Sequence, residues 1–173
     1  MNPANDENGV HWGATVADHI TVELHNSTTY LTEATFSDQN LNTDGTCNVN
    51  IPAAYGNSYY IAIKHRNSVQ TWSSLPVSFT GSAINYNFSN SVANSYGDNI
   101  KEVATGIYAI YVGDVNQDEV VDLSDLVQMD TDLTAGTVAY IVYDLNGDGV
   151  VDLSDLVAID ENLTNGVVAM FPQ

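Results

Sequence analysis

Positive charge is almost absent from this chain of 173 residues, which has three Lys and Arg against 22 Asp and Glu and a net charge of −19. Nucleic-acid binding needs a basic face to neutralise phosphates, and three cations cannot build one. Attraction to an anionic membrane surface is disfavoured for the same reason. The acidic balance predicts that the chain binds cations.

Cysteine and long apolar runs are also scarce. Cys47 is the only cysteine, which excludes an internal disulfide and a multi-cysteine zinc site, and we interpret it as a small half-buried residue. No apolar run is long enough to span a bilayer, so we predict no membrane insertion. The opening MNPANDENGV lacks the basic and apolar regions of a signal peptide. We expect a fragment of a larger chain, with residues 1–10 flexible.

The charge is distributed unevenly along the chain. Residues 114–173 contain thirteen acidic residues and no Lys or Arg, whereas the preceding part holds nine acids and all three bases, Lys64, Arg66 and Lys101. We therefore predict two modules, residues 1–112 and 113–173. A hydrophobic content of 44% is ample for packed cores, so the acidity does not indicate disorder.

An acidic segment occurs twice. GDVNQDEVVDLSD at residues 113–125 and YDLNGDGVVDLSD at 143–155 align without a gap at an offset of 30. Carboxylates this close repel one another, so each loop needs a neutralising partner. Calcium takes about six to eight oxygen ligands, which a loop supplies from side chains at positions 1, 3, 5 and 12, a carbonyl at 7 and a water held by 9.

Both loops supply that ligand set. The expected ligands of the first are Asp114, Asn116, Asp118, the carbonyl of Val120, Asp122 through water, and Asp125. Those of the second are Asp144, Asn146, Asp148, the carbonyl of Val150, Asp152 through water, and Asp155. Magnesium would use fewer protein ligands and zinc would require His or Cys. The sequence therefore predicts two calcium ions.

A helix is expected after each loop but not before it. Leu126, Val127 and Leu133 have the spacing of one helix face, and the second repeat has the same pattern. Asp122 and Asp152 are suitable N-caps for these helices. Residues 105–113 and 137–143 are aromatic and β-branched, which favours extended chain over the entering helix of an EF-hand.

A duplicated calcium loop followed by one helix resembles the type I dockerin. The resemblance covers residues 113–173 and rests on the segments GDVNQDEVVDLSD and DLNGDGVVDLSD. It implies two F-hand units packed antiparallel, two calcium ions, and a cohesin partner on another secreted protein, as in bacterial polysaccharide-degrading assemblies. It also implies partner contacts at loop positions 10 and 11, which are Leu123, Ser124, Leu153 and Ser154.

Two departures from the family pattern affect the site and the partner. Glu119 stands where the sharp turn favours the glycine that the second loop has at Gly149, so we expect a strained or weaker first site. A helix pair that is often basic in the family is here Asp130–Thr131 and Asp160–Glu161. This acidity indicates a different partner, or no cohesin partner.

The first module is predicted to be an all-β antiparallel sandwich, Ig-like in class. Short β-rich runs at residues 20–31, 46–52, 58–66, 77–80, 84–89 and 107–112 alternate with turn signals. The stretch TDG…NVNIP…GNSYYIAIKHR resembles prealbumin-like modules of secreted bacterial proteins, which implies a spacer or a stability partner for the second module.

The cationic, Trp and His side chains of the first module allow both a functional and a purely structural interpretation. Lys64, His65, Arg66 and Trp72 would suit a carboxylate or glycan contact, but ion pairing by Arg66 and core packing by Trp72 are better supported. His11, His19 and His25 show no metal-ligand spacing. No nucleophile elbow, phosphate loop or His–Glu zinc motif is present, and the carboxylates fit a calcium shell better than a glycosidase pair. We predict no enzyme activity.

The sequence thus predicts a non-catalytic, calcium-binding appendage that tethers or stabilises a larger secreted or cell-surface protein, one that degrades polysaccharides in the dockerin analogy. Extracellular calcium can fill sites with dissociation constants of about 10⁻⁴ to 10⁻³ M, so we expect an extracellular or bacterial cell-surface location. Two alternatives remain open. One is a calcium-stabilised unit with no cohesin partner, docked internally through Tyr108, Tyr111 and Tyr140, and the other is a carbohydrate-binding sandwich.

Overall fold

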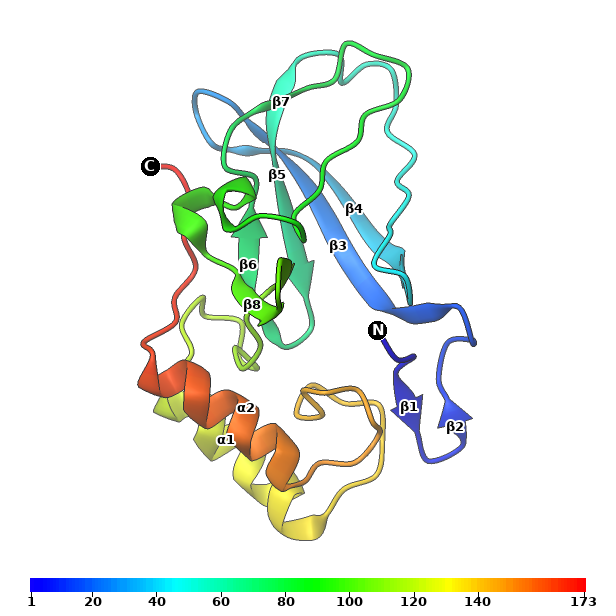
Figure 1. Ribbon diagram of the computed structural model, residues 1–173, viewed down its shortest axis with the longest axis vertical. Coiled ribbons are helices and arrows are strands. Elements are labelled where there is room, and N and C mark those ends of the chain that lie inside the picture. Colours follow the sequence, from blue (N-terminus) through cyan, green and yellow to red (C-terminus); the bar gives the residue numbers. More distant parts are fainter.

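The computed structural model describes residues 1–173, with a β-rich part and a pair of helices (Figure 1). Its largest sheet contains β3 (Val16–Asn26), β4 (Thr32–Asn42), β5 (Ser58–His65), β6 (Ser68–Trp72) and β7 (Val77–Ser78). The strands are antiparallel in the order β4-β3-β5-β6, with β7 beside β5. The central strand β3 is rich in β-branched and apolar residues and is buried along most of its length.

Two small hairpins and two 3₁₀ turns complete the first module. The N-terminal hairpin consists of β1 (Asn5–Asp6) and β2 (Gly9–Val10), and the other of β8 (Lys101–Ala104) and β9 (Ile107–Ala109). The turns η1 (Val92–Asn94) and η2 (Tyr96–Asp98) precede β8. The antiparallel β character predicted for this module is confirmed.

The layer packed against the sheet is mostly irregular chain. Ile20, Val22 and Leu24 alternate along β3 and form a core with Tyr59 and Ile61. Apolar side chains of the covering segments pack on this core: Cys47, Val49, Ile51, Tyr55, Phe79, Tyr86 and Phe88. Residues 84–89 form no strand and residues 46–52 form one bridge, from Cys47 to Leu41. The strands predicted in these two segments are therefore not formed: their apolar side chains pack on the core, but the segments lack a neighbouring strand with which to pair.

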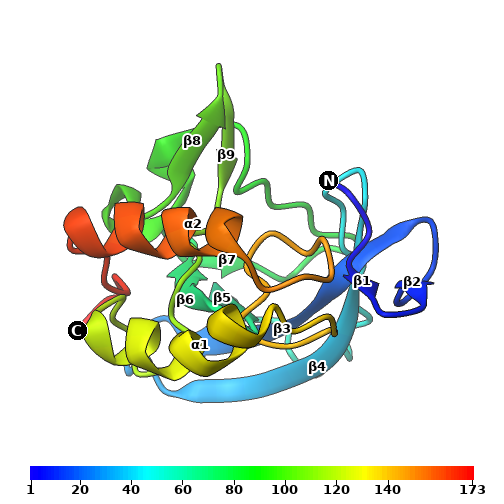
Figure 2. The same cartoon turned by 90° about the horizontal axis from the view of Figure 1, so that it is seen from below.

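The second module contains α1 (Leu123–Ala135) and α2 (Leu153–Thr164), which lie antiparallel and side by side (Figures 1 and 2). Each begins at the predicted cap: the Asp122 and Asp152 side chains accept from the helix N-terminus, and the Asp three residues later accepts from the cap N–H. The segments directly before the two loops, residues 105–113 and 137–143, are not helical, as predicted. Neither helix is long and apolar enough to cross a membrane.

The two modules share a core. Val69 of β6 is buried among the apolar side chains of the second module, which include Val121, Met129, Val151 and Ile159. Residues 113–173 therefore do not bury all of their apolar surface by themselves, and the sheet supplies part of the packing. The boundary near Gly113 remains an interpretation of the sequence.

The flexibility of residues 1–10 remains a prediction, but the structure gives the start of the chain specific tertiary contacts. Ala4 is 2% exposed, and its N–H donates to the carbonyl of Ala17 at 2.7 Å. The N–H of Asn5 donates to the carbonyl of Gly147 at 3.0 Å. The N-terminal hairpin is thus held between the sheet and the second acidic loop, a tertiary contact that local composition does not reveal.

Candidate metal centre

The first acidic loop folds around the carboxylates at positions 1 and 12. The two oxygens of Asp114 accept from the N–H groups of Asp118 and Glu119, each at 3.1 Å. From the other end of the loop, Asp125 Oδ1 accepts from the N–H of Val115 at 2.9 Å. The loop is therefore closed on itself, with both carboxylates turned inward.

The second loop repeats this geometry. Asp144 accepts from the N–H groups of Gly147 and Gly149, at 2.8 and 3.0 Å. Asp155 Oδ1 accepts from the N–H of Leu145 at 2.8 Å. The duplication seen in the sequence is thus a duplication of hydrogen-bonded structure.

The side chains at positions 3 and 5 also turn into the loops. Asn116 Oδ1 accepts from the N–H of Asp118 at 2.8 Å, and Asp118 Oδ1 accepts from that of Val120 at 3.2 Å. The second loop has the same two bonds among Asn146, Asp148 and Val150. In each loop these turns hold two side-chain oxygens, one at position 3 and one at position 5, against the loop backbone.

The residues at position 9 cap the helices. Asp122 and Asp152 are exposed, and each accepts from the N–H of the serine two residues later at 2.7 Å. Hydrogen bonds from Ser124 and Ser154 lower the pKa of these two carboxyls. Their role as water-bridged calcium ligands remains a prediction.

Each loop carries buried carboxyl groups that form no salt bridge with a cationic side chain. Asp114 is 1% exposed, and Asp125, Asp144 and Asp155 are fully buried. Burial, together with the nearby carboxylates of Asp125 and Glu119, raises the pKa of Asp114 to about 6. Burial also raises the pKa values of Asp144 and Asp155. A hard divalent cation that prefers oxygen ligands would satisfy both loops.

The structure does not gather three or more His, Cys, Asp or Glu side chains into a preassembled metal centre. The expected shell relies equally on an Asn oxygen and a backbone carbonyl in each loop, from Asn116 and Val120 and from Asn146 and Val150. Bound calcium would supply the positive charge that the loops lack. The donor types therefore fit calcium, and the individual ligands remain predictions.

The two repeats exchange backbone hydrogen bonds. The N–H of Val121, after the first loop, donates to the carbonyl of Val167 at 2.9 Å. The N–H of Val151, after the second loop, donates to that of Thr137 at 2.9 Å. Thr137 and Val167 are themselves 30 residues apart, so each loop pairs with the chain that follows the other helix. The loops form one paired unit.

Position 6 is left-handed in both loops. Glu119 has φ 75° and Gly149 has φ 89°, as the sharp turn requires. A residue with a Cβ is strained in this region, which confirms the backbone basis of the sequence argument. Glu119 has a compensating contact, because its Oε2 accepts from the N–H of Gln70 on β6 at 3.5 Å.

Sequence analysis missed the residues that join the sheet to the loops. Asn67, in the turn between β5 and β6, is fully buried and donates from Nδ2 to the carbonyl of Asp144 at 3.0 Å. Asp18 on β3 lies 3.0 Å from His65 Nε2 and accepts from the hydroxyl of Tyr140. Each contact joins residues more than 40 positions apart, and no local pattern marks such pairs.

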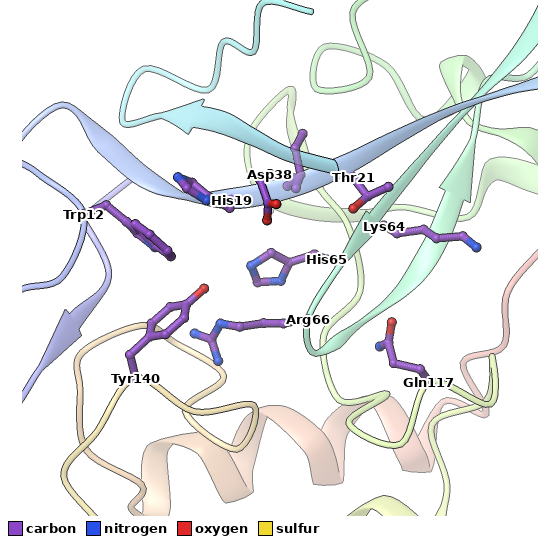
Figure 3. A pocket seen from close by; sticks show the side chains of 10 residues that line it. Trp12, His19, Thr21, Asp38, Lys64, His65, Arg66, Gln117 and Tyr140 are labelled. Atoms are coloured by element: carbon purple, nitrogen blue, oxygen red, sulfur yellow. The ribbon is translucent and has the colours of Figure 1, made fainter. Parts of the chain in front are cut away.

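An open pocket of about 490 Å³ lies at this junction (Figure 3). Its cations are already neutralised: Lys64 pairs with Glu23 at 3.2 Å, and Arg66 pairs with Asp18 at 3.3 Å. Arg66 also lies over the ring of Tyr140, 4.4 Å from its centroid. Ion pairing by Arg66 is therefore confirmed, and the pocket offers no free cation to a carboxylate or a glycan.

The aromatic residues proposed for other roles are packed. Trp72 is 4% exposed and lies in a cluster with Tyr60 and Phe171, so core packing at the module junction is confirmed. Tyr111 packs against the core of the second module and Tyr140 binds Asp18, whereas Tyr108 pairs within the β8–β9 hairpin. Docking of the second module onto the sheet thus involves two of the three tyrosines expected.

The residues expected to bind a partner are exposed. Leu123 is 64% and Leu153 is 70% exposed, and one turn further along each helix Val127 is 72% and Val157 is 66% exposed. Ser124 and Ser154 lie between them on the exposed surface. We call these six residues the docking face.

No protein-family model and no curated protein matches this chain. Two solved structures match its fold, both of a type II cohesin–X–dockerin complex from Acetivibrio cellulolyticus. The chain from an N-terminal interface mutant is 18% identical, with a TM-score of 0.50, covering 96% of this chain and 94% of that one. The chain from a C-terminal interface mutant is 16% identical, with the same TM-score and coverage.

These matches define the class of fold. An antiparallel β module followed by a two-helix module is the architecture of an X-module–dockerin unit, and it extends over almost the whole chain. The dockerin resemblance read from the sequence is confirmed for the fold, with a likeness to a chain from a type II complex. The X–dockerin unit is a non-catalytic module type.

Proposed function

We propose that this chain is a non-catalytic calcium-binding docking unit that binds a cohesin-like protein and so tethers or stabilises a larger protein. The observation that supports it best is the docking face, a duplicated apolar surface on an X-module–dockerin fold. Exposed apolar residues at matched positions of two helices have no structural role within the chain. They fit the centre of a protein interface.

The predicted calcium ligands are connected to this face. Asn116 at position 3 donates from Nδ2 to Ser124 Oγ at 2.7 Å, and Asn146 donates to Ser154 Oγ at 2.6 Å. The Asn oxygens that would bind calcium therefore belong to side chains that also orient the face serines. Calcium would thus both hold the helices and fix the polar part of the docking face.

The rim of the face indicates the chemistry of the partner. Exposed acids flank the apolar residues on both helices: Asp122, Asp130, Asp152 and Asp160. Residues 114–173 contain no Lys or Arg. A partner with Lys and Arg around an apolar centre would complement this surface.

The proposed location is extracellular or on a bacterial cell surface. Calcium sites of extracellular modules have dissociation constants of about 10⁻⁴ to 10⁻³ M. Sites of this affinity are filled by extracellular calcium and stay empty at cytosolic calcium concentrations. Calcium would then stabilise a chain that has a single cysteine and no disulfide.

The proposed calcium binding is tested by titration calorimetry on chelator-stripped protein, with thermal unfolding in parallel. We expect two ions and a large rise in melting temperature. Asp144→Ala combined with Asp148→Ala should remove one ion and loosen residues 113–173. Unchanged stoichiometry in that variant would refute the ligand assignment.

The partner half is tested by measuring binding to each cohesin module encoded in the same genome. Replacing Leu123 and Leu153 by Asp should abolish binding while two calcium ions are retained. Leu75→Asp is the matched control, because Leu75 is 69% exposed on the first module. If no cohesin binds but calcium still raises the melting temperature, the intramolecular alternative is correct.

A further inference from the structure

One residue of the first module holds the beginning of both acidic loops. Asn67 is fully buried in the turn between β5 and β6, and its carbonyl accepts from the N–H of Gly113 at 2.7 Å. Its side-chain Nδ2 donates to the carbonyl of Asp144 at 3.0 Å. Gly113 directly precedes position 1 of the first loop, and Asp144 is position 1 of the second. The two loops therefore meet at a single side chain and its own backbone.

A difference between the repeats explains why the second loop uses Asn67. In the first loop, Gln117 at position 4 donates from Nε2 to the carbonyl of Asp114 at 2.6 Å. The equivalent residue of the second loop is Gly147, which has no side chain. Asn67 supplies the missing donor to the equivalent carbonyl, that of Asp144. The first loop thus uses an amide of its own, that of Gln117, whereas the second loop uses the amide of Asn67 from the turn between β5 and β6.

The orientation of the Asn67 amide is fixed by contacts of its oxygen atom. Its Oδ1 lies 3.0 Å from His65 Nδ1, and His65 Nε2 lies 3.0 Å from Asp18 Oδ2. Asp18 in turn accepts from the hydroxyl of Tyr140, which precedes the second loop. Asn67 is therefore a rigid connection rather than a mobile surface side chain.

We infer that Asn67 couples the two loops, so that an ion bound in one loop raises the calcium affinity of the other. The inference rests on the proposed calcium function. An ion that fixes position 1 of either loop also fixes Asn67, and the ordering of Asn67 is then no longer a cost to the second binding step. Asn67 acts as a positioning residue, since it contacts the loop backbone and supplies no ligand oxygen to the predicted shell.

The test is a double-mutant cycle on the whole chain, with calcium as the titrant. Asp148→Ala weakens the second site at a side chain that makes no bond with Asn67, and the Glu119 amide signal in NMR spectra reads the first loop alone. We expect Asp148→Ala to weaken calcium binding at the first loop about threefold to tenfold in the natural background. In an Asn67→Ala background the same substitution should leave the affinity of the first loop unchanged.

Two further variants separate coupling from general stability. Asn67→Asp keeps the side-chain volume but lacks the donor, so it should behave as Asn67→Ala does. Ser73→Ala removes a buried hydroxyl that accepts from Ile61 and donates to Leu75, without touching either loop, so it should preserve the coupling. Coupling that survives both Asn67 substitutions, or that Ser73→Ala removes equally, would overturn the inference. If both loops bind calcium independently, the coupling inference is refuted and the proposed function stands. If neither loop binds calcium, the proposed function is refuted as well.

Discussion

The ring of Phe171 lies against that of Trp72, with centroids 5.8 Å apart. This contact brings the last residues of the chain back from α2 to the sheet. On the way, the N–H of Ala169 donates to the carbonyl of Glu119 at 2.7 Å, and Met170 forms a parallel bridge with Thr71. The C-terminal tail is therefore a further connection between the modules, and it joins the first acidic loop to β6.

Phe171→Ala should destabilise the whole chain rather than only its tail. The ring is partly buried against Trp72, and its loss should lower the free energy of unfolding by about 1–3 kcal/mol. Thermal unfolding measures the change. Leu75→Ala, at a residue 69% exposed, is the control and should leave the melting temperature unchanged.

Glu119→Gly should tighten calcium binding at the first loop. Glycine adopts the φ of 75° without strain, although the contact with the N–H of Gln70 is lost. The converse change is Gly149→Ala, whose Cβ would lie 3.0 Å from the backbone of Asn5. It should weaken the second loop. Site-resolved NMR titration measures both, and a first loop that binds no tighter in the glycine variant would refute the strain argument.

Acid should weaken the junction through Asp18. Burial alone would raise the pKa of Asp18, but hydrogen bonds from His65 and Tyr140 and the charge of Arg66 outweigh it and hold the pKa well below its usual 3.8. As the pH falls, Asp18 is protonated in the unfolded chain before it is protonated in the folded chain. The stabilisation by ionised Asp18 is therefore complete at neutral pH and is lost as the pH falls below about 4.

Asp18→Asn isolates this effect. The variant should be less stable than the natural chain by about 1–3 kcal/mol at pH 7. The difference should shrink as the pH falls below about 4, because Asp18 of the natural chain is then protonated in the unfolded state while it is still ionised in the folded state. Urea unfolding across this range measures it, and a difference that is constant with pH would show that the Asp18 charge does not stabilise the junction.

Calcium binding should release protons in mildly acidic solution. In the ion-free chain burial raises the pKa of Asp114 to about 6, and calcium requires the ionised carboxylate. Affinity should therefore fall as the pH drops below about 6, and each binding event near that pH should release protons that are absent at pH 8. Calorimetry in two buffers of different ionisation enthalpy counts these protons, and Asp114→Asn should abolish the release at the first loop.

The second module was largely predictable because its information is local. Asp122 and Asp152 mark the helix starts by residue type and spacing, and the structure begins both helices directly after them. The constant offset of 30 residues showed which positions of the two loops and helices are equivalent. Its internal pairing was not predictable, since a pattern along the chain does not show that Val121 pairs with Val167 rather than with Thr137.

The first module was less predictable because its strands depend on distant neighbours. β4, with the sequence TEATFSDQNLN, is polar and largely exposed, and it is a strand because β3 offers it a hydrogen-bonding edge. Residues 84–89 alternate like a strand, yet Tyr86 and Phe88 only pack on the sheet. The junction residues Asn67 and Asp18 carried no signal, because each is ordinary in its local sequence and acquires its role from contacts far along the chain.

The N-terminal hairpin covers the second loop but not the first. The backbone of Asn5 lies 3.0 Å from the place of a Cβ at Gly149, and its N–H donates to the carbonyl of Gly147, whereas no hydrogen bond joins the hairpin to the first loop. An ion leaves a loop only when the loop opens, and the second loop can open only when β1 lifts away from it. We therefore expect the residence time of calcium in the second loop to depend on the N-terminal hairpin, and that in the first loop to depend on the C-terminal tail, whose Ala169 N–H donates to Glu119.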